Sequence, residues 1–153
     1  EVRSAVTGIR ASDLAAELAA ARLLLECQHV HLHYAPPPPM PAEIERGLAL
    51  VLREAATNIV RHAQANEAWV QFEQDARTLC MRVRDDGTGG VQADGNGLTG
   101  MRERVAALRG TLHVHSAKGQ GTTVTVQVPL PAATTAVPPP PATAPALPSG
   151  VLP

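Results

Sequence analysis

A row of polar side chains interrupts an otherwise apolar stretch at residues 53–63, REAATNIVRHA. Glu54, Asn58 and His62 follow one another at intervals of four, which places them on one face of a helix. An acid, an amide and an imidazole in such a row are unusual on a helix whose other residues are mostly apolar. The residues alone leave open why this helix carries them.

A glycine-rich loop follows a predicted strand at residues 85–90, DDGTGG. Gly87 and Gly89 would let the backbone approach a ligand without an intervening side chain. Asp85 would lie at the mouth of this loop, where its carboxylate is a suitable acceptor for an exocyclic amine. Taken alone, the stretch is more simply interpreted as an ordinary Asp-Gly turn.

Two further glycine-containing stretches come later in the chain. Residues 95–101, GNGLTGM, open a predicted helix, and backbone N–H groups at such a position favour phosphate. Residues 119–123, GQGTT, are by default a hairpin turn. Each pattern alone is weak, since a flexible loop or a plain turn would also explain it.

Helices are expected on either side of a strand in the first half of the chain. Ser12 or Asp13 can begin a helix that runs to about Cys27. The alternating stretch at 27–35 predicts a strand, and the prolines of 36–41 predict a surface connector. A second helix is expected at about 42–64. The apolar face of the first helix is predicted to consist of Leu14, Leu18 and Leu25.

The second half of the chain is predicted to contain most of the strands. Residues 67–75 and 78–86 indicate a hairpin, in which Trp69 is out of phase with its apolar neighbours. A helix is expected from 97 to 110, with Gly110 as its natural end. Strands are expected at 111–116 and 122–130, the second with three valines on one face: Val124, Val126 and Val128.

The bulk composition supports one folded unit with additional length. Hydrophobic residues make up 44% of the 153 residues but aromatic ones only 2%, so the core must be aliphatic. A net charge of −1 gives no reason to expect broad attraction to nucleic acids or membranes, and no stretch is long enough to span a bilayer. Residues 131–153 hold most of the 14 prolines and predict a disordered tail. Residues 11–130 are expected to form an α/β two-layer sandwich.

The four patterns together, in this order, are far more specific than any one of them. The chain resembles the ATP-binding domain of sensor histidine kinases, in the superfamily of gyrase, the heat-shock chaperone and the mismatch-repair ATPase. The resemblance is greatest to the nitrate and membrane-fluidity sensor kinases, whose N box is similar to REAATNIVRHAQA, and covers about residues 1–130. It implies a Bergerat-type fold, with about five strands in a mixed, mostly antiparallel sheet beneath about three helices.

The resemblance also implies roles for individual residues. Asn58 would hold Mg²⁺ against the phosphates of ATP, and Arg61 and His62 would face those phosphates. Glu54 matches the acid of the N box and is the candidate catalytic residue, while Asp85 would accept from the adenine amino group. Thr122 would support Asp85. Seven further residues would shape the nucleotide loops and the helix start: Gly87, Gly89, Gly95, Gly97, Leu98, Gly100 and Met101.

The chain departs from the family's pattern in ways that limit its activity. Gly90 stands where a large apolar residue is usual, and the lid between Gly90 and Asp94 is short. Residues 1–10 resemble only the end of the dimerisation helix, so the phosphoacceptor His would lie upstream. We therefore expect a monomeric, cytoplasmic piece of a longer kinase, which can be membrane-anchored. It would bind ATP, donate phosphate to a dimerisation domain outside this chain, and act indirectly on a response regulator.

Other interpretations remain open at this point. A serine kinase of the anti-sigma-factor type shares the superfamily, and a nucleotide-binding interaction module without catalysis would retain the fold. His29, His31 and His33 could bind a metal or form a solvent-facing row on a strand, which is the simpler interpretation, and His113 and His115 invite the same two interpretations. Two residues are expected to be buried, reduced thiols: Cys27 and Cys80.

Overall fold

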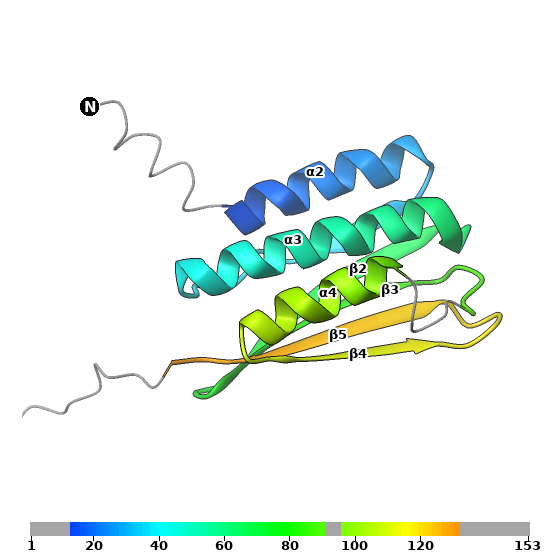
Figure 1. The fold of residues 1–153 in the computed structure, drawn as a ribbon. Coiled ribbons are helices and arrows are strands. Elements are labelled where there is room, and N and C mark those ends of the chain that lie inside the picture. The colour runs from blue at the N-terminus through cyan, green and yellow to red at the C-terminus, as the bar shows by residue number, and fades with distance from the viewer. Residues whose placement is uncertain (1–12, 91–95, 132–153) are drawn as a thin grey trace, which may run out of the picture.

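The computed structural model describes residues 13–90 and 96–131. Within these ranges five strands form one sheet, and α2, α3 and α4 all lie on one side of it (Figure 1). This arrangement confirms the predicted α/β two-layer sandwich. Almost all of the predicted segments 1–10 and 131–153 lie outside the described residues.

Helix α2 (Asp13–Cys27) is fixed to α3 (Ala42–Asn58) by apolar packing and by polar contacts. Its first turn is held by the Leu14 N–H, which donates to the Glu45 carboxylate at 3.1 Å. Farther along, Arg53 donates to the Glu17 carboxylate at 2.9 Å. The predicted apolar stripe is confirmed, because three of its leucines are fully buried: Leu14, Leu18 and Leu25.

Both α2 and α4 end in a left-handed residue that is not glycine. His29 has a φ of 64° and Arg109 a φ of 62°. At each end the two hydrogen bonds of a Schellman motif are present, and after α4 they run from Gly110 to Val105 and from Arg109 to Ala106. Gly110 is therefore not the left-handed residue that ends the helix. Glycine is needed at position 110 for a different reason, because a Cβ there would lie 2.4 Å from the Gln127 carbonyl oxygen.

Helix α3 carries the polar row and packs its opposite face on the sheet. The helix expected at 42–64 is present, but its last five residues form a π-helix, η1 (Ile59–Ala63), and Gln64 then reverses the chain with a φ of 52°. Wider turns of this kind are frequent at functional sites. The buried face of α3 consists of seven residues: Ile44, Leu48, Ala49, Val51, Leu52, Ala55 and Ala56.

The sheet has the order β1-β2-β3-β5-β4 and contains one parallel pair, β1 with β2. All other pairs are antiparallel, which confirms the mixed, mostly antiparallel sheet. Alternate side chains point to the helices, and Trp69 lies out of phase with the buried Val70, as predicted. The strands are β1 (His31–Tyr34), β2 (Glu67–Gln74), β3 (Thr78–Asp85), β4 (Thr111–Ser116) and β5 (Thr122–Pro129).

The histidines whose side chains the structure describes do not gather into a metal site. His29 lies outside β1, because it belongs to the Schellman turn that ends α2. The prediction that His29, His31 and His33 alternate on one strand was therefore wrong. His31 and His33 are exposed and contact carboxylates, His33 with Glu67 at 2.6 Å. In the part of the chain that the structure describes, no cluster of three or more His, Cys, Asp or Glu residues could hold a metal ion.

The two cysteines differ in their surroundings. Cys80 is buried, as predicted, and burial raises the pKa of its thiol. Cys27 is exposed, so the prediction that it lies in the core was wrong. The reason is helical geometry, since Cys27 follows the buried Leu25 by two positions and therefore faces away from α3.

Candidate functional site

The predicted site residues converge on one end of the molecule. The carboxyl end of α3 with η1, the end of β3, the start of α4 (Asn96–Ala107) and the start of β5 all lie at that end (Figure 1). Asp85 and Thr122 are paired across β3 and β5 in the register of the sheet. The fold thus brings together residues that lie far apart in the sequence.

Asp85 is the one buried charged residue among the described residues, with an exposed fraction of 3%. Its carboxylate accepts a hydrogen bond from the Gly87 N–H at 2.8 Å. Burial raises the pKa of Asp85, and the charge of Asp86 raises it further, although N–H groups of Gly87 and Thr122 oppose this. A buried carboxylate with few protein donors has acceptor capacity left for a ligand.

Thr122 supports Asp85 through its backbone, whereas its side chain has another partner. The hydroxyl groups of Thr122 and Ser116 lie 2.7 Å apart across β4 and β5. The Thr122 N–H is among the groups that stabilise the ionised form of Asp85. Ser116 was not identified from the sequence, because its relation to Thr122 depends on the pairing of β4 with β5.

The loop after β3 and the turn between β4 and β5 are packed backbone against backbone. The Gly119 N–H donates to the Thr88 carbonyl oxygen. A Cβ on Gly89 would lie 2.1 Å from the Ala117 carbonyl oxygen, and one on Gly121 would lie 2.1 Å from that of Asp85. The close backbone approach that Gly89 allows in this structure is thus to Ala117 and not to a ligand. Two of the three glycine-containing stretches form one interlocked unit around Asp85.

The polar row on α3 leaves two side chains available to a ligand. Glu54 and Asn58 are half-buried, one turn apart, and neither has a hydrogen-bond or ion-pair partner among the described residues. Arg61 is exposed in η1, and only the backbone of His62 is described. Unpaired oxygen atoms of an amide and a carboxylate are the donors that Mg²⁺ prefers, so these residues fit that ion.

The first turns of α4 are anchored in the core. Leu98 and Met101 are buried, with exposed fractions of 3% and 0%, so they hold the start of the helix in place. Gly100 is open, because a Cβ there would meet no atom within 4 Å. Gly97 belongs to this first turn, whereas Gly95 lies outside the described residues.

Asp86 is a site residue that the sequence did not single out. Its carboxylate accepts from the backbone N–H groups of Asn66 and Glu67, at 2.8 and 3.0 Å. It thereby joins the loop after β3 to the segment that follows η1. The only signal in the sequence was the Asp85–Asp86 doublet, and nothing in the doublet indicates which partner Asp86 binds.

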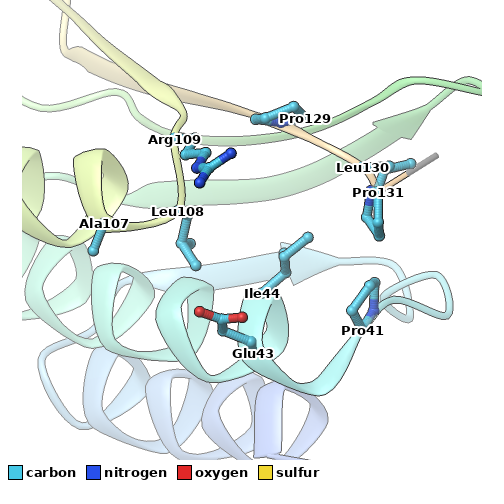
Figure 2. A pocket seen from close by; sticks show the side chains of 9 residues that line it. All are labelled: Pro41, Glu43, Ile44, Ala107, Leu108, Arg109, Pro129, Leu130 and Pro131. Atoms are coloured by element: carbon cyan, nitrogen blue, oxygen red, sulfur yellow. The ribbon is translucent and has the colours of Figure 1, made fainter.

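A cavity of about 480 Å³ lies between the start of α3, the end of α4 and the end of β5. Figure 2 shows Ile44 and Leu108 on facing sides of it, with Leu130 at its margin. None of the predicted site residues lines this cavity. It lies at the opposite end of α3 from Asn58, about 25 Å away at 1.5 Å per residue.

The two-layer sandwich, with polar residues and glycine-rich loops gathered at one end, is the architecture of a Bergerat-type nucleotide-binding domain. The chain belongs to the family of histidine kinase-, DNA gyrase B- and HSP90-like ATPases, whose model matches residues 43–132. This match confirms the resemblance on which the sequence-based prediction of function rested.

Several curated relatives are sensor kinases. The chain is 32% identical over 136 residues to the sensor histidine kinase DesK of Bacillus subtilis (strain 168), covering 84% of this chain and 36% of that protein. It is 44% identical over 82 residues to the signal transduction histidine-protein kinase/phosphatase UhpB of Salmonella typhimurium, covering 52% of this chain and 16% of that protein. The chain thus spans only about a third or less of these relatives.

A solved structure gives the same result for the fold. The histidine kinase domain of the blue-light activated histidine kinase from Erythrobacter litoralis EL346 superposes with a TM-score of 0.64 at 25% identity. The match covers 78% of this chain and 61% of that one. The helices that the structure describes include none that is both long and apolar enough to cross a membrane.

Proposed function

We propose that this chain is the Mg-ATP-binding catalytic domain of a two-component sensor histidine kinase. It would donate the γ-phosphate of ATP to a histidine on a dimerisation domain outside this chain. The observation that carries the proposal is Asp85, a buried carboxylate held by backbone N–H groups. It lies at the same end of the fold as Asn58, whose side chain has no partner among the described residues. The family match and the sensor kinases among the relatives support it.

Each end of the nucleotide has residues suited to it. Asp85 would accept a hydrogen bond from the adenine amino group, because an ionised carboxylate is an acceptor only. The open position at Gly100 and the backbone N–H groups of the first turn of α4 would admit a phosphate. Arg61 and His62, which lie in η1, would face the phosphates from the other side.

Asn58 and Glu54 are the residues proposed for the metal and for catalysis. Asn58 would bind Mg²⁺ through its amide oxygen, and the ion would neutralise part of the phosphate charge. Glu54 lies one turn earlier on α3 and would act as a base or hold water near the transferred phosphate. Both roles require side chains without protein partners, and both side chains meet that requirement in the described part of the chain.

The proposed partners follow from the same relatives. A dimerisation domain with a phosphoacceptor histidine would receive the phosphate, and a response regulator would receive it afterwards. We place the domain in the cytoplasm, where ATP is available, with a parent kinase that can be anchored in the membrane. The curated kinases favour a histidine acceptor over the serine acceptor of an anti-sigma-factor type kinase.

The direct test is phosphoryl transfer to a dimerisation domain supplied as a separate chain. With radiolabelled Mg-ATP, we expect phosphate on that domain that is labile in acid and stable in base, as a phosphohistidine is. The Glu54→Gln variant should still bind Mg-ATP but transfer phosphate roughly a hundredfold more slowly. An acid-stable phosphate would indicate the serine kinase instead. Binding without any transfer would favour the interaction module.

A further inference from the structure

Among the described residues, three hydrogen bonds of Asp86 join the loop after β3 to the segment after η1. Its carboxylate accepts from the N–H groups of Asn66 at 2.8 Å and Glu67 at 3.0 Å. Its own N–H donates to the Glu67 carbonyl oxygen at 3.1 Å. The last paired residues of the hairpin are Ala68 and Asp85, so these bonds continue the β2–β3 pairing beyond its regular end.

The segment that Asp86 holds is the direct continuation of the polar row. Asn66 follows η1 by three residues, and the left-handed Gln64 lies between them. On the other side, Asp86 lies between Asp85 and Gly87 in the chain. The Asp85 carboxylate is held by the N–H groups of Gly87, in the loop after β3, and of Thr122, in β5. Asp86 is therefore the polar side chain that connects the β3 end of the candidate site to the η1 end.

A nucleotide that spans this site needs both ends held at a fixed separation. Misplacement of a binding group by a fraction of an ångström weakens a contact that depends on direction, such as a hydrogen bond or a metal ligand. Base recognition needs only the β3 end, whereas phosphate and metal binding also need the α3 and η1 end. Loosening the connection should therefore affect the two parts of the ligand differently.

We propose that Asp86 is a positioning residue for Mg-nucleotide, which sets the distance between the base-reading carboxylate of Asp85 and the phosphate-facing residues Asn58 and Arg61. This inference rests on the proposed function, since it assigns the two ends of the site to base and phosphate. Asp86 acts through the segment at 64–67 and need not touch the nucleotide.

The chain provides a matched control at the other end of the same hairpin. Asp75 accepts from the N–H groups of Arg77 at 2.7 Å and Thr78 at 2.8 Å. It is exposed, like Asp86, and likewise holds backbone N–H groups next to a strand. Seven residue pairs of β2 and β3 lie between the two positions, which are therefore eight steps apart, about 27 Å at 3.4 Å per step. Asp75→Ala removes equivalent bonds without changing the candidate site.

The experiment measures binding of adenosine and of Mg-ADP to the whole chain by titration calorimetry. For Asp86→Ala we expect Mg-ADP binding about tenfold weaker, and adenosine binding changed by less than about twofold, since only the phosphate end is released. Asp86→Asn should bind both as wild type does, because its amide oxygen can accept the same two bonds. Asp75→Ala should also bind both as wild type does, despite a similar loss of stability.

A second variant keeps the test decisive if Asp86→Ala does not fold. Asp86→Glu retains the charge but displaces the carboxylate by one methylene, and it should weaken Mg-ADP and leave adenosine unchanged. The inference is overturned if Asp86→Ala or Asp86→Glu weakens adenosine and Mg-ADP equally, or if neither ligand is affected. If wild type shows no Mg²⁺-dependent gain of ADP over adenosine, the proposed function fails and not merely this inference.

Discussion

Gly121 lies directly against the backbone of Asp85, so closely that a Cβ on Gly121 would be 2.1 Å from the Asp85 carbonyl oxygen. Gly121 also has a φ of 75°, a conformation that residues with a side chain rarely adopt. The turn between β4 and β5 therefore packs against the end of β3 and fixes its position. The position of the Asp85 carboxylate depends on a residue that has no side chain.

A substitution pair separates this close approach from backbone strain. Gly121→Ala should destabilise the domain by about 3 kcal/mol or more, because it adds a clash with backbone to the cost of positive φ. Gly119→Ala, in the same turn with a φ of 82° and no atom within 4 Å, should cost only about 1 kcal/mol. Urea unfolding measures both values. Equal losses would show that the contact with Asp85 contributes nothing.

The stability of the unliganded domain should depend on pH through Asp85. Burial raises the pKa of this carboxyl group, so the folded state binds the proton more tightly than the unfolded state. The stability that the protonated Asp85 carboxyl group contributes is fully present below its pKa in the unfolded state, about 3.9. This contribution is lost as the pH rises through the pKa of Asp85 in the folded state. Asp85→Asn should therefore be more stable than wild type at pH 7, with the difference decreasing towards pH 3 in urea titrations.

Asp75 provides the opposite sign as a control for that measurement. Hydrogen bonds from the backbone N–H groups of Arg77 and Thr78 lower its pKa, so its contribution is present above the unfolded pKa and is lost as the pH falls through the folded value. Asp75→Asn should be less stable than wild type at pH 7 and equal to it at low pH. If both variants change in the same direction, burial is not what sets the titration of Asp85.

The dependence of nucleotide binding on Mg²⁺ should require Asn58. Its amide oxygen suits a hard cation, so Asn58→Ala should lose the gain in ADP affinity that Mg²⁺ gives, whereas Asn58→Asp keeps part of it. Thr57→Ala is the control, because the Thr57 hydroxyl is bonded within α3 to the Arg53 carbonyl oxygen. Titration calorimetry with and without Mg²⁺ makes the comparison. The same Mg²⁺ response in Asn58→Ala and wild type would refute the assignment.

Preference for adenine should depend on the charge of Asp85. A carboxylate accepts from the adenine amino group but cannot donate to the guanine carbonyl, and an unpaired buried polar group costs about 1–3 kcal/mol. This corresponds to a preference for ADP over GDP of roughly tenfold to a hundredfold. Asp85→Asn should weaken ADP and reduce the preference, since the amide can donate. A variant that binds ADP as well as wild type would exclude Asp85 as the base reader.

Removal of residues 132–153 should leave the melting temperature and the affinity for ATP almost unchanged. The sequence of this segment is rich in proline and alanine and has few large apolar side chains that could be buried. Differential scanning calorimetry and an ATP titration of the shortened chain provide the measurement. A drop in melting temperature of several degrees would place the domain boundary farther along the chain than residue 131.

The parts of the fold that depend on periodic burial could be predicted from the sequence. The spacing of Leu14, Leu18 and Leu25 located α2, and the alternation at Val124 and Val126 located β5, since each pattern repeats over several residues. The sequence also indicated that Asp85, Asn58 and Gly97 would gather, because strand ends and helix starts bring them to one end of this fold. Their roles towards a ligand stay predictions.

The remaining features depend on contacts that no local pattern encodes. His29 and Arg109 adopt left-handed conformations for which glycine is the usual signal. The end of α2 at Cys27 was predicted, but α4 ends at Ala107 and not at Gly110, because Arg109 takes the left-handed position. The change to a π-helix at Ile59 has no signature in REAATNIVRHA. The bonds of Asp86 join residues about twenty positions apart, and only the assembled hairpin determines them.

The shortness of β1 has a consequence for the behaviour of the domain at high concentration. β1 forms one edge of the sheet and has only four residues, and the prolines at 36–39 follow it almost at once. Proline has no backbone N–H, so a foreign strand that paired with this edge would find no continuous row of donors beyond Tyr34. The same prolines that lead the chain to α3 thus protect this edge of the sheet against intermolecular strand addition.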